Sequence, residues 1–158
     1  MAQMDRSKVV EILMYYRNIE GEIRLYRSIV DDLEGYYDTI RGQNMDGMPH
    51  GSGGGSSVVE NTALNLPPDL QKNIDYYNGK ISDLHRLKVE TLKEVSSLEQ
   101  RLACIVMDYY LNGLKWEQVS VRNHYSERQC KNIRNTAIDS LAQKFGENAV
   151  IAGFEIPA

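Results

Sequence analysis

The chain has 158 residues, a mass of 18.0 kDa and a formal net charge of −4 at pH 7. Hydrophobic residues make up 42 % of it and charged residues 25 %, so we expect a chain that buries a core rather than a disordered one. The acidic balance, taken as an average, argues against nucleic acid as a partner. No stretch approaches the ~18 consecutive apolar residues of a membrane span, and the first residues lack the pattern of a secretory signal, so we expect a cytoplasmic protein with no membrane partner.

The sequence shows none of the common catalytic or metal-ligating patterns. Cys104, Cys130 and the histidines stand without the paired spacing of a zinc site, so we expect neither a metal nor a disulfide. No nucleophile elbow, paired-carboxylate motif or nucleotide-binding loop is found. We therefore expect no enzyme, with no catalytic residues, no cofactor and no small-molecule substrate.

The N-terminal segment, residues 1–41, has the apolar periodicity of one long helix. Its apolar residues are separated by alternating steps of three and four, the heptad pattern of a helix that packs along one seam. A helix of this length suits a hairpin or an oligomer better than a compact globule. The seam residues are Val9, Ile12, Tyr16, Ile19, Ile23, Tyr26, Val30, Leu33, Tyr37 and Ile40.

The next segment, residues 42–65, is predicted as a flexible linker. Glycine and serine dominate from Gly51 to Ser57, and Pro49 precedes them. Fixing glycine costs conformational entropy and proline blocks the continuation of a helix, so regular structure is not expected here. A phosphate-binding loop is excluded, because no Gly-Lys-Ser/Thr ends the run and no strand pattern precedes it.

A second long helix is predicted over residues 66–95. Pro67 and Pro68 favour a helix start, because proline is tolerated in the first turn. The same spacing then continues through Leu70, Ile74, Tyr77, Ile81 and Leu84, with Lys88 at a later seam position. We expect this helix to fold back antiparallel on the first as a coiled-coil-like hairpin, or to pair with another chain. A purely structural hairpin and a homodimer through the long helices are both consistent with the pattern.

The C-terminal segment, residues 96–145, begins with a predicted break in the apolar pattern. Ser96 with Glu99, or Ser97 with Gln100, has the spacing of a capping box, which indicates the start of a new helix. Asn112-Gly113 is a typical signal for the end of that helix.

Two short helices are expected to follow, one from Leu114 to about Asn123 and one capped by Ser126. Two helices joined by a short turn have the spacing of a helix-turn-helix, whose second helix lies in the major groove of DNA. The expected fold is therefore all-α, with a long helical hairpin and a C-terminal helix-turn-helix domain. The predicted inner face of the last helix consists of Cys130, Ile133, Ala137, Ile138 and Leu141.

The outward face of the last helix carries side chains suited to DNA. Arginine and lysine can bind guanine or phosphate, and asparagine can bind adenine. We assign Arg128, Lys131 and Asn132 to base edges. The alternative is that this face is only a solvated surface. Phosphate contacts are assigned to a second set, which consists of Arg122, Ser126 and Asn135. The full set of predicted DNA-binding residues is Arg122, Ser126, Glu127, Arg128, Lys131, Asn132, Arg134 and Asn135.

Leu98 to Leu141 resembles region 4 of the sigma-70 family, whose helix-turn-helix reads a promoter element. The resemblance is carried by Leu114-Lys-Trp-Glu-Gln-Val-Ser120 in the supporting helix and by Ser126-Glu-Arg-Gln-Cys-Lys-Asn-Ile133 in the reading helix. It implies a winged-helix-like DNA-binding domain. It also implies that Glu127, Arg128, Lys131 and Asn132 face the DNA.

The whole chain resembles the RinA/ArpU type of phage and prophage late-gene regulator. That type places a heptad-rich helix and a Met-Pro-x-Gly-Ser-Gly loop, here Met48 to Gly53, ahead of the sigma-like end. The resemblance implies a transcription regulator in a bacterial host cell. Its partners would be double-stranded DNA, a second copy of the chain and RNA polymerase.

The acidity of the chain is unevenly distributed. Residues 1–96 carry 11 basic and 15 acidic side chains, whereas residues 114–144 carry six basic and three acidic ones. The predicted helix-turn-helix is therefore locally basic, which removes the objection to DNA as a partner.

Two alternatives remain open: a DNA-packaging protein like a small terminase subunit, and a helical scaffold that binds only protein. The tail, residues 146–158, is expected to dock on the core or on a partner.

Overall fold

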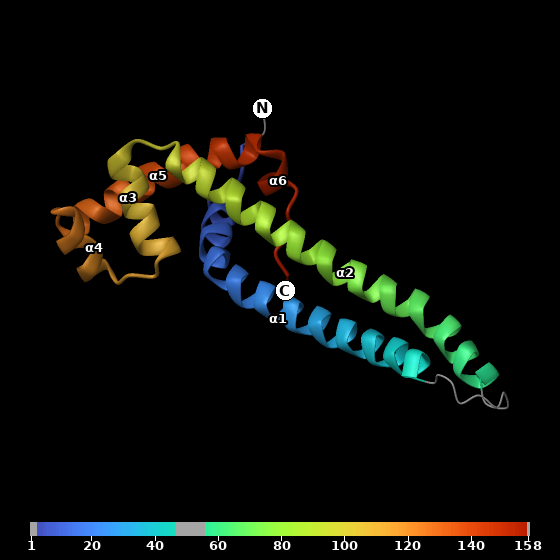
Figure 1. The fold of residues 1–158 in the computed structure, drawn as a ribbon. Helices are drawn as coiled ribbons and strands as arrows, with labels where there is room; N and C mark the ends of the chain where they lie inside the picture. Colours follow the sequence, from blue (N-terminus) through green and yellow to red (C-terminus); the bar gives the residue numbers. More distant parts are fainter. Residues whose placement is uncertain (1–2, 47–55, 158) are drawn as a thin grey trace. The chain divides into compact units, whose positions relative to one another are not determined.

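The computed structural model describes the backbone of residues 3–46 and 56–157, and the side chains of residues 3–39 and 69–157. All regular elements in this part of the chain are helical, which confirms the all-α class (Figure 1). They are α1 (Arg6–Asp46), α2 (Ser56–Ser96), α3 (Gln100–Val106), the π-helix η1 (Met107–Leu111), α4 (Trp116–Asn123), α5 (Glu127–Glu147) and α6 (Ala149–Ala152).

The two long helices extend further into the predicted linker than the sequence indicated. α1 continues to Asp46, and α2 begins at Ser56 instead of near Leu66. Residues 57–65 contain neither glycine nor proline, so nothing in their backbone opposes a helix. The remaining part of the predicted linker, residues 47–55, lies outside the described residues.

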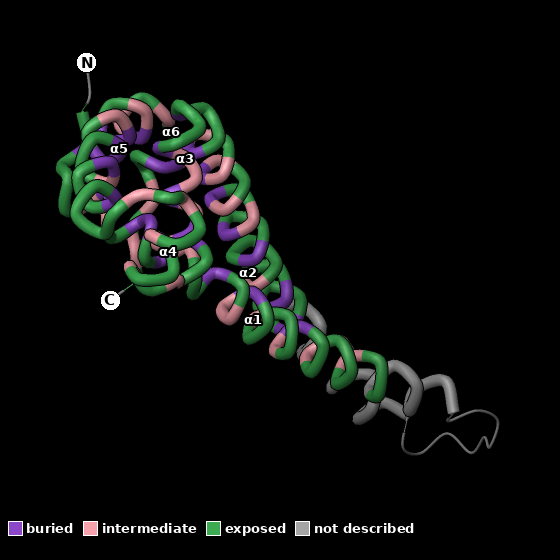
Figure 2. Tube along the Cα trace, turned by 90° about the vertical axis from the view of Figure 1, so that its left-hand side faces the viewer, coloured by how far each residue is buried: buried purple, intermediate pink, exposed green. Residues whose placement is uncertain are grey.

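The chain divides into two compact units, and the division differs from the predicted boundary at residue 96. Unit 1 comprises Met1–Gly21 and Leu84–Ala158, and unit 2 comprises residues 22–83. Unit 1 therefore contains the first turns of α1 and the last turns of α2 together with all the shorter helices. The predicted seam of α1 supplies core residues to both units, as the buried positions along α1 show (Figure 2).

In unit 1, residues of α1 and α2 share one core with α3, α5 and α6. Fully buried members of this core are Val9, Ile12, Leu13, Ile19, Leu87, Val95, Ile105, Leu141, Phe145 and Ile151. At these positions hydrophobic burial is the main stabilising contribution. The predicted inner face of the last helix is confirmed, because all five of its residues are buried.

Contacts between α1 and α2 are polar as well as apolar. In unit 1 the amine of Lys88 pairs with the Glu20 carboxylate and lies 5.8 Å from the centroid of the Tyr16 ring. The hydrogen bond to Glu20 raises the pKa of Lys88, so the amine stays charged at this seam position. In unit 2 the rings of Tyr26 and Tyr77 lie with their centroids 5.7 Å apart.

The break after α2 occurs where it was predicted, but the capping prediction is wrong. The hydroxyls of Ser96 and Ser97 donate to the carbonyl oxygens of Lys93 and Glu94, at 2.9 and 2.7 Å, and so close the end of α2. The residue before α3 is Glu99, whose side chain makes no capping hydrogen bond. Serine bonds back to the preceding turn as readily as it caps a following one, which explains the difference.

The tail packs against unit 1. The side-chain oxygen of Asn148 accepts hydrogen bonds from the amides of Val150 and Ile151 and so caps α6. Beyond α6, the ring of Phe154 lies 5.8 Å from that of Tyr15, centroid to centroid. Docking of the tail on the core, one of the two predicted possibilities, is therefore observed.

Candidate nucleic-acid interface

α4 and α5 are joined by a short turn whose geometry is fixed by local hydrogen bonds. His124 adopts a left-handed conformation with φ 59°, which ends α4. The Ser120 hydroxyl donates to the carbonyl oxygen of Tyr125 at 2.5 Å, and the Tyr125 amide donates to the carbonyl oxygen of Ser120 at 3.3 Å. These two bonds hold the turn closed between the helices.

Ser126 caps α5, as the sequence predicted. Its hydroxyl oxygen accepts from the Gln129 amide at 3.1 Å, and its own amide donates to the Gln129 side-chain oxygen at 3.0 Å. The hydroxyl also donates to that same oxygen at 3.2 Å. Ser126 thus satisfies one of the free amides at the start of α5, that of Gln129. Its hydroxyl is already engaged at the position where a phosphate contact was predicted.

Five of the predicted DNA-binding residues form an exposed strip along α5. They recur at helical spacing on the side away from the buried inner face, so they share one surface. Within the described part of the chain, neither Arg128 nor Asn132 has a side-chain hydrogen bond or ion pair. The members of this strip are Glu127, Arg128, Lys131, Asn132 and Asn135.

Arg134 lies at the edge of this strip and is held by two contacts. Its guanidinium carbon is 5.2 Å from the centroid of the Trp116 ring, and its Nε donates to the side-chain oxygen of Asn135 at 2.8 Å. The amine of Lys131 is 5.9 Å from the same ring. Trp116 in turn stacks on Tyr109 of η1, with centroids 3.8 Å apart and planes inclined by 15°.

Sequence reasoning missed this aromatic support. The sequence assigns Trp116 to the supporting helix but indicates no partner for it on α5. The available signal was the pair of cations at positions 131 and 134, which lie on adjacent turns of one helix face and can both reach an aromatic ring.

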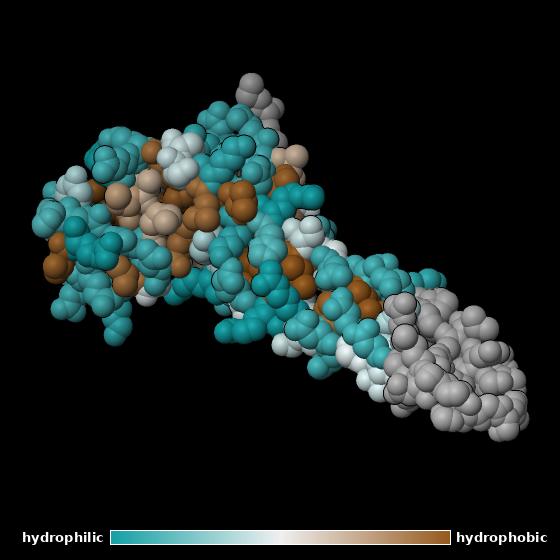
Figure 3. Space-filling model, viewed as in Figure 1, coloured by the Kyte–Doolittle hydropathy of each residue, from teal (hydrophilic) through white to brown (hydrophobic). Residues whose placement is uncertain are grey.

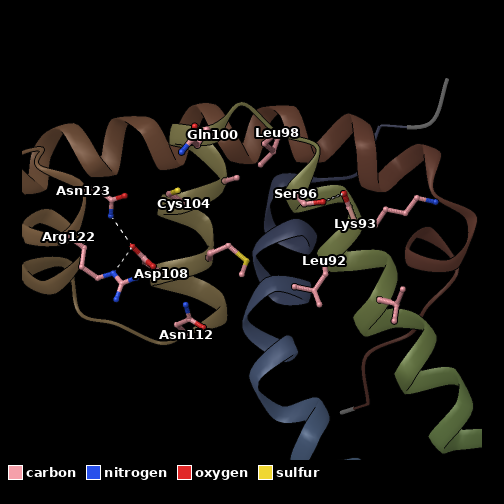
Figure 4. Close-up of a pocket in the computed structure, with 13 residues that line it drawn as sticks. Leu92, Lys93, Ser96, Leu98, Gln100, Cys104, Asp108, Asn112, Arg122 and Asn123 are labelled. Atoms are coloured by element: carbon pink, nitrogen blue, oxygen red, sulfur yellow. Dashed lines mark hydrogen bonds and ion pairs between the residues drawn. The ribbon is translucent and has the colours of Figure 1, made fainter.

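Arg122 is not part of the α5 strip. Its Nε lies 3.4 Å from the carboxylate of Asp108, which is buried in η1. Asn123 donates to the same carboxylate oxygen at 2.9 Å and also to the carbonyl oxygen of Val119 at 2.8 Å. Figure 4 shows Arg122 and Asn123 both directed at Asp108. The buried acid thereby ties the end of α4 to η1.

The same three residues border an open groove of about 850 Å³. Its remaining lining is mostly apolar and comes from residues between Val89 in α2 and Asn112 after η1, with Leu92, Leu98 and Met107 among the contributors. On the face drawn in Figure 3, hydrophobic side chains (brown) gather in several patches that hydrophilic side chains (teal) surround.

One acidic side chain of α5 is neutralised within the fold. Asp139 forms an ion pair with Arg6 of α1, although both side chains remain at least half exposed. The other two acids between residues 114 and 144 are Glu117 and Glu127.

Within the described part of the chain no cluster of His, Cys, Asp and Glu could hold a metal ion. None of the described helices is long and apolar enough to cross a membrane.

Comparison of the chain with protein-family models, with curated proteins and with solved structures finds no match.

Proposed function

We propose that the protein is a sequence-specific DNA-binding regulator of transcription in which α4 and α5 act as a helix-turn-helix. α5 would enter the major groove of double-stranded DNA, as the second helix of such a pair does. The observation that carries this proposal is the exposed strip on α5 defined above, which begins immediately after the Ser126 cap. The resemblance to sigma-70 region 4 and to phage late-gene regulators of the RinA/ArpU type points to the same role, and to RNA polymerase as a further partner.

The roles of the side chains follow from their hydrogen-bonding groups. Arg128 and Lys131 offer donors for guanine or phosphate, and Asn132 offers a donor and an acceptor for adenine. Arg122 keeps its terminal nitrogens available for a phosphate, while its Nε faces Asp108. The contribution of Ser126 would be to orient the first turn of α5 rather than to bind phosphate through its hydroxyl.

We propose further that the long helices provide a homodimer contact, and that this contact uses residues outside the seam. The seam residues Val9, Ile12, Ile19, Ile23 and Val30 are buried within one chain. Large apolar side chains that remain exposed on the long helices in unit 2 are Leu25, Tyr36 and Tyr76, with 56 %, 53 % and 57 % of their surface accessible. Two copies would provide two reading helices. Because one helix carries only a modest positive charge, binding through both copies would raise the affinity for DNA.

A gel-shift experiment on the DNA that flanks the gene tests DNA binding. Arg128→Ala and Lys131→Ala are expected to weaken binding by about tenfold each at low salt. Lys72→Ala, which removes an exposed charge from α2, serves as the control and should bind like the wild type. If all four proteins bind equally, or if none binds at low salt, the proposed function is wrong.

The oligomeric state is tested by light scattering coupled to size exclusion. A dimer that dissociates in Leu25→Asp, with unchanged circular dichroism, supports the proposed contact. A monomer contradicts the dimer but not DNA binding by α5. A ring of eight or more chains would favour the packaging protein instead.

A further inference from the structure

The indole ring of Trp116 brings together two cations of α5. The amine of Lys131 lies 5.9 Å from the ring centroid, and the guanidinium carbon of Arg134 lies 5.2 Å from it. Both distances fall within the ~6 Å over which a cation is attracted to an aromatic face. The two positive charges therefore lie on the side of α5 that faces the start of α4.

Neither of these charges is compensated inside the fold. Within the described part of the chain, no carboxylate forms an ion pair with Lys131 or Arg134. Nε of Arg134 donates to the side-chain oxygen of Asn135 at 2.8 Å, so the terminal nitrogens of the guanidinium remain as donors for a ligand. The amine of Lys131 supplies further donors and no acceptor. Two neighbouring cations of this kind suit an anion whose oxygens only accept hydrogen bonds.

The ring that attracts the two cations is itself held in place. Trp116 stacks on Tyr109 of η1, as described above. Tyr109 in turn meets the ring of Tyr110 edge to face, with centroids 4.9 Å apart and planes inclined by 82°. Tyr110 is buried, so the indole is connected through Tyr109 to the core of unit 1. Side chains held by a fixed ring have less freedom to lose when they bind a ligand.

The position of the two cations determines which part of DNA they would contact. In a helix-turn-helix the first helix crosses the sugar–phosphate backbone, whereas the first residues of the second helix reach base edges. Trp116 begins the first of the two helices. Arg134 follows Glu127, the first residue of α5, by seven positions, or about 10 Å along the helix axis. The cations beside Trp116 therefore lie where the backbone would pass.

We infer that Lys131 and Arg134 form a clamp for DNA phosphate, and that Trp116 is the positioning residue that holds both cations. The inference rests on the proposed function and deepens it. Helical spacing alone assigned Lys131 to a base edge, whereas its contact with Trp116 assigns it to the backbone. Base reading is left to Arg128 and Asn132. The clamp would add affinity for DNA of any sequence, because phosphate contacts carry no direct sequence information.

The clamp is tested by fluorescence anisotropy of the full chain with two labelled duplexes over a range of salt concentrations. One duplex is the DNA that flanks the gene, and the other is a scrambled duplex of the same composition. Arg134→Ala and Lys131→Ala should each weaken binding to both duplexes by the same factor, about tenfold at low salt. Each should also reduce the slope of log affinity against log salt by about 0.9, the value for one phosphate contact. Arg128→Ala should instead weaken binding to the flanking DNA more than to the scrambled duplex.

The positioning role of Trp116 is tested on the same two duplexes. Trp116→Leu should weaken binding to both by about threefold, the loss expected for exposed cation–π contacts. Trp116→Phe keeps an aromatic face and should restore most of the affinity. Added to the Lys131→Ala/Arg134→Ala double variant, Trp116→Leu should cause no further loss, because no cation is left to position. Val121→Ala, at an exposed site on the same helix, should bind like the wild type.

A second measurement needs no substitution at Trp116. Because this is the only tryptophan, its fluorescence reports on the clamp in the unmodified protein. Titration with either unlabelled duplex should change the emission, since phosphate would displace water from the cations beside the indole. Circular dichroism confirms that each variant used in the binding experiments is folded.

The outcomes separate the inference from the proposed function. If Arg134→Ala and Lys131→Ala weaken binding to the flanking DNA alone, these residues contact bases and the clamp is refuted. If Trp116→Leu lowers the affinity equally in the wild type and in the double variant, or if DNA leaves the fluorescence unchanged, the positioning role of Trp116 is refuted. DNA binding by α5 survives each of these results. If the wild type binds neither duplex at low salt, the proposed function fails and the inference fails with it.

Discussion

The ring of Trp116 lies nearly parallel to that of Tyr109, with 3.8 Å between the centroids and 15° between the planes. Tyr109 belongs to η1 and Trp116 begins α4, so one stacked pair joins the two elements on either side of the Asn112-Gly113 bend. Arg134 approaches the same indole from α5. The stacked pair therefore connects η1 and α4 with α5, the proposed reading helix.

Removing the stack should destabilise the protein. Tyr109→Leu is expected to lower the free energy of unfolding by about 1–2 kcal/mol, because an aromatic pair contributes beyond the area it buries. Urea unfolding followed by circular dichroism measures the loss. Trp116 is the only tryptophan, so its fluorescence should also shift to longer wavelength. Val121→Ala, at an exposed site on α4, should change stability by less than about 0.5 kcal/mol. Equal effects of the two substitutions would contradict the role of the stack.

The cap of α5 can be separated from DNA binding by two substitutions at Ser126. Ser126→Ala should cost about 1 kcal/mol of stability, because the Gln129 amide loses its acceptor. Ser126→Asp preserves the acceptor and should leave stability nearly unchanged. The added negative charge at the start of α5 should nevertheless weaken binding to DNA several-fold. Thermal unfolding and a gel shift on the same samples give both quantities. DNA binding unaffected by Ser126→Asp would place this turn away from the phosphates.

Two glycines are expected to respond in opposite directions to alanine. Gly113 has φ +71°, and a Cβ there would lie 2.6 Å from the guanidinium of Arg17. Gly113→Ala should therefore destabilise by about 1 kcal/mol or more, since L residues avoid this conformation. Gly79 lies inside α2, and the methyl group of an alanine there would meet nothing within 4 Å, so Gly79→Ala should stabilise by about 0.5–1 kcal/mol. Denaturant midpoints measured side by side test the pair, and a change of the same sign at both sites would refute this account.

The two cysteines should differ in reactivity. Cys130 is fully buried, and burial raises the pKa of its thiol, with the charge of Glu127 adding to the effect. A raised pKa means less thiolate at neutral pH, and the thiolate is the reactive form. Cys104 is partly exposed at the groove. Titration with a thiol reagent should modify one cysteine of the native protein quickly and both after denaturation. In Cys104→Ser the fast reaction should disappear; if it persists, Cys130 is accessible after all.

Features set by short-range spacing were predictable from the sequence. The alternating apolar steps identified five buried seam residues of α1, from Val9 to Val30, but not the buried Leu13 and Tyr15. Ser126 identified the start of α5. The inner face of α5, from Cys130 to Leu141, followed from helical periodicity. In each case the determining residues lie within a few turns of one another, so no knowledge of the tertiary structure was needed.

Features that depend on contacts between distant segments were not predictable. The π-helical turn η1 places Tyr109 beside Trp116, and no local pattern marks that turn. Likewise Asp108 could not be matched with Arg122 before the path of η1 and α4 was known. Helical spacing gives the direction of a side chain but not its partner. The sequence therefore assigned Arg122 to the DNA-binding face without its ion pair to Asp108.

The division of the chain into units has a consequence for synthesis. Val9, Ile12 and Leu13 are buried in unit 1, whose other residues, Leu84–Ala158, come much later in the sequence. During synthesis the first turns of α1 can therefore complete this core only after the residues that follow Leu84 have been made.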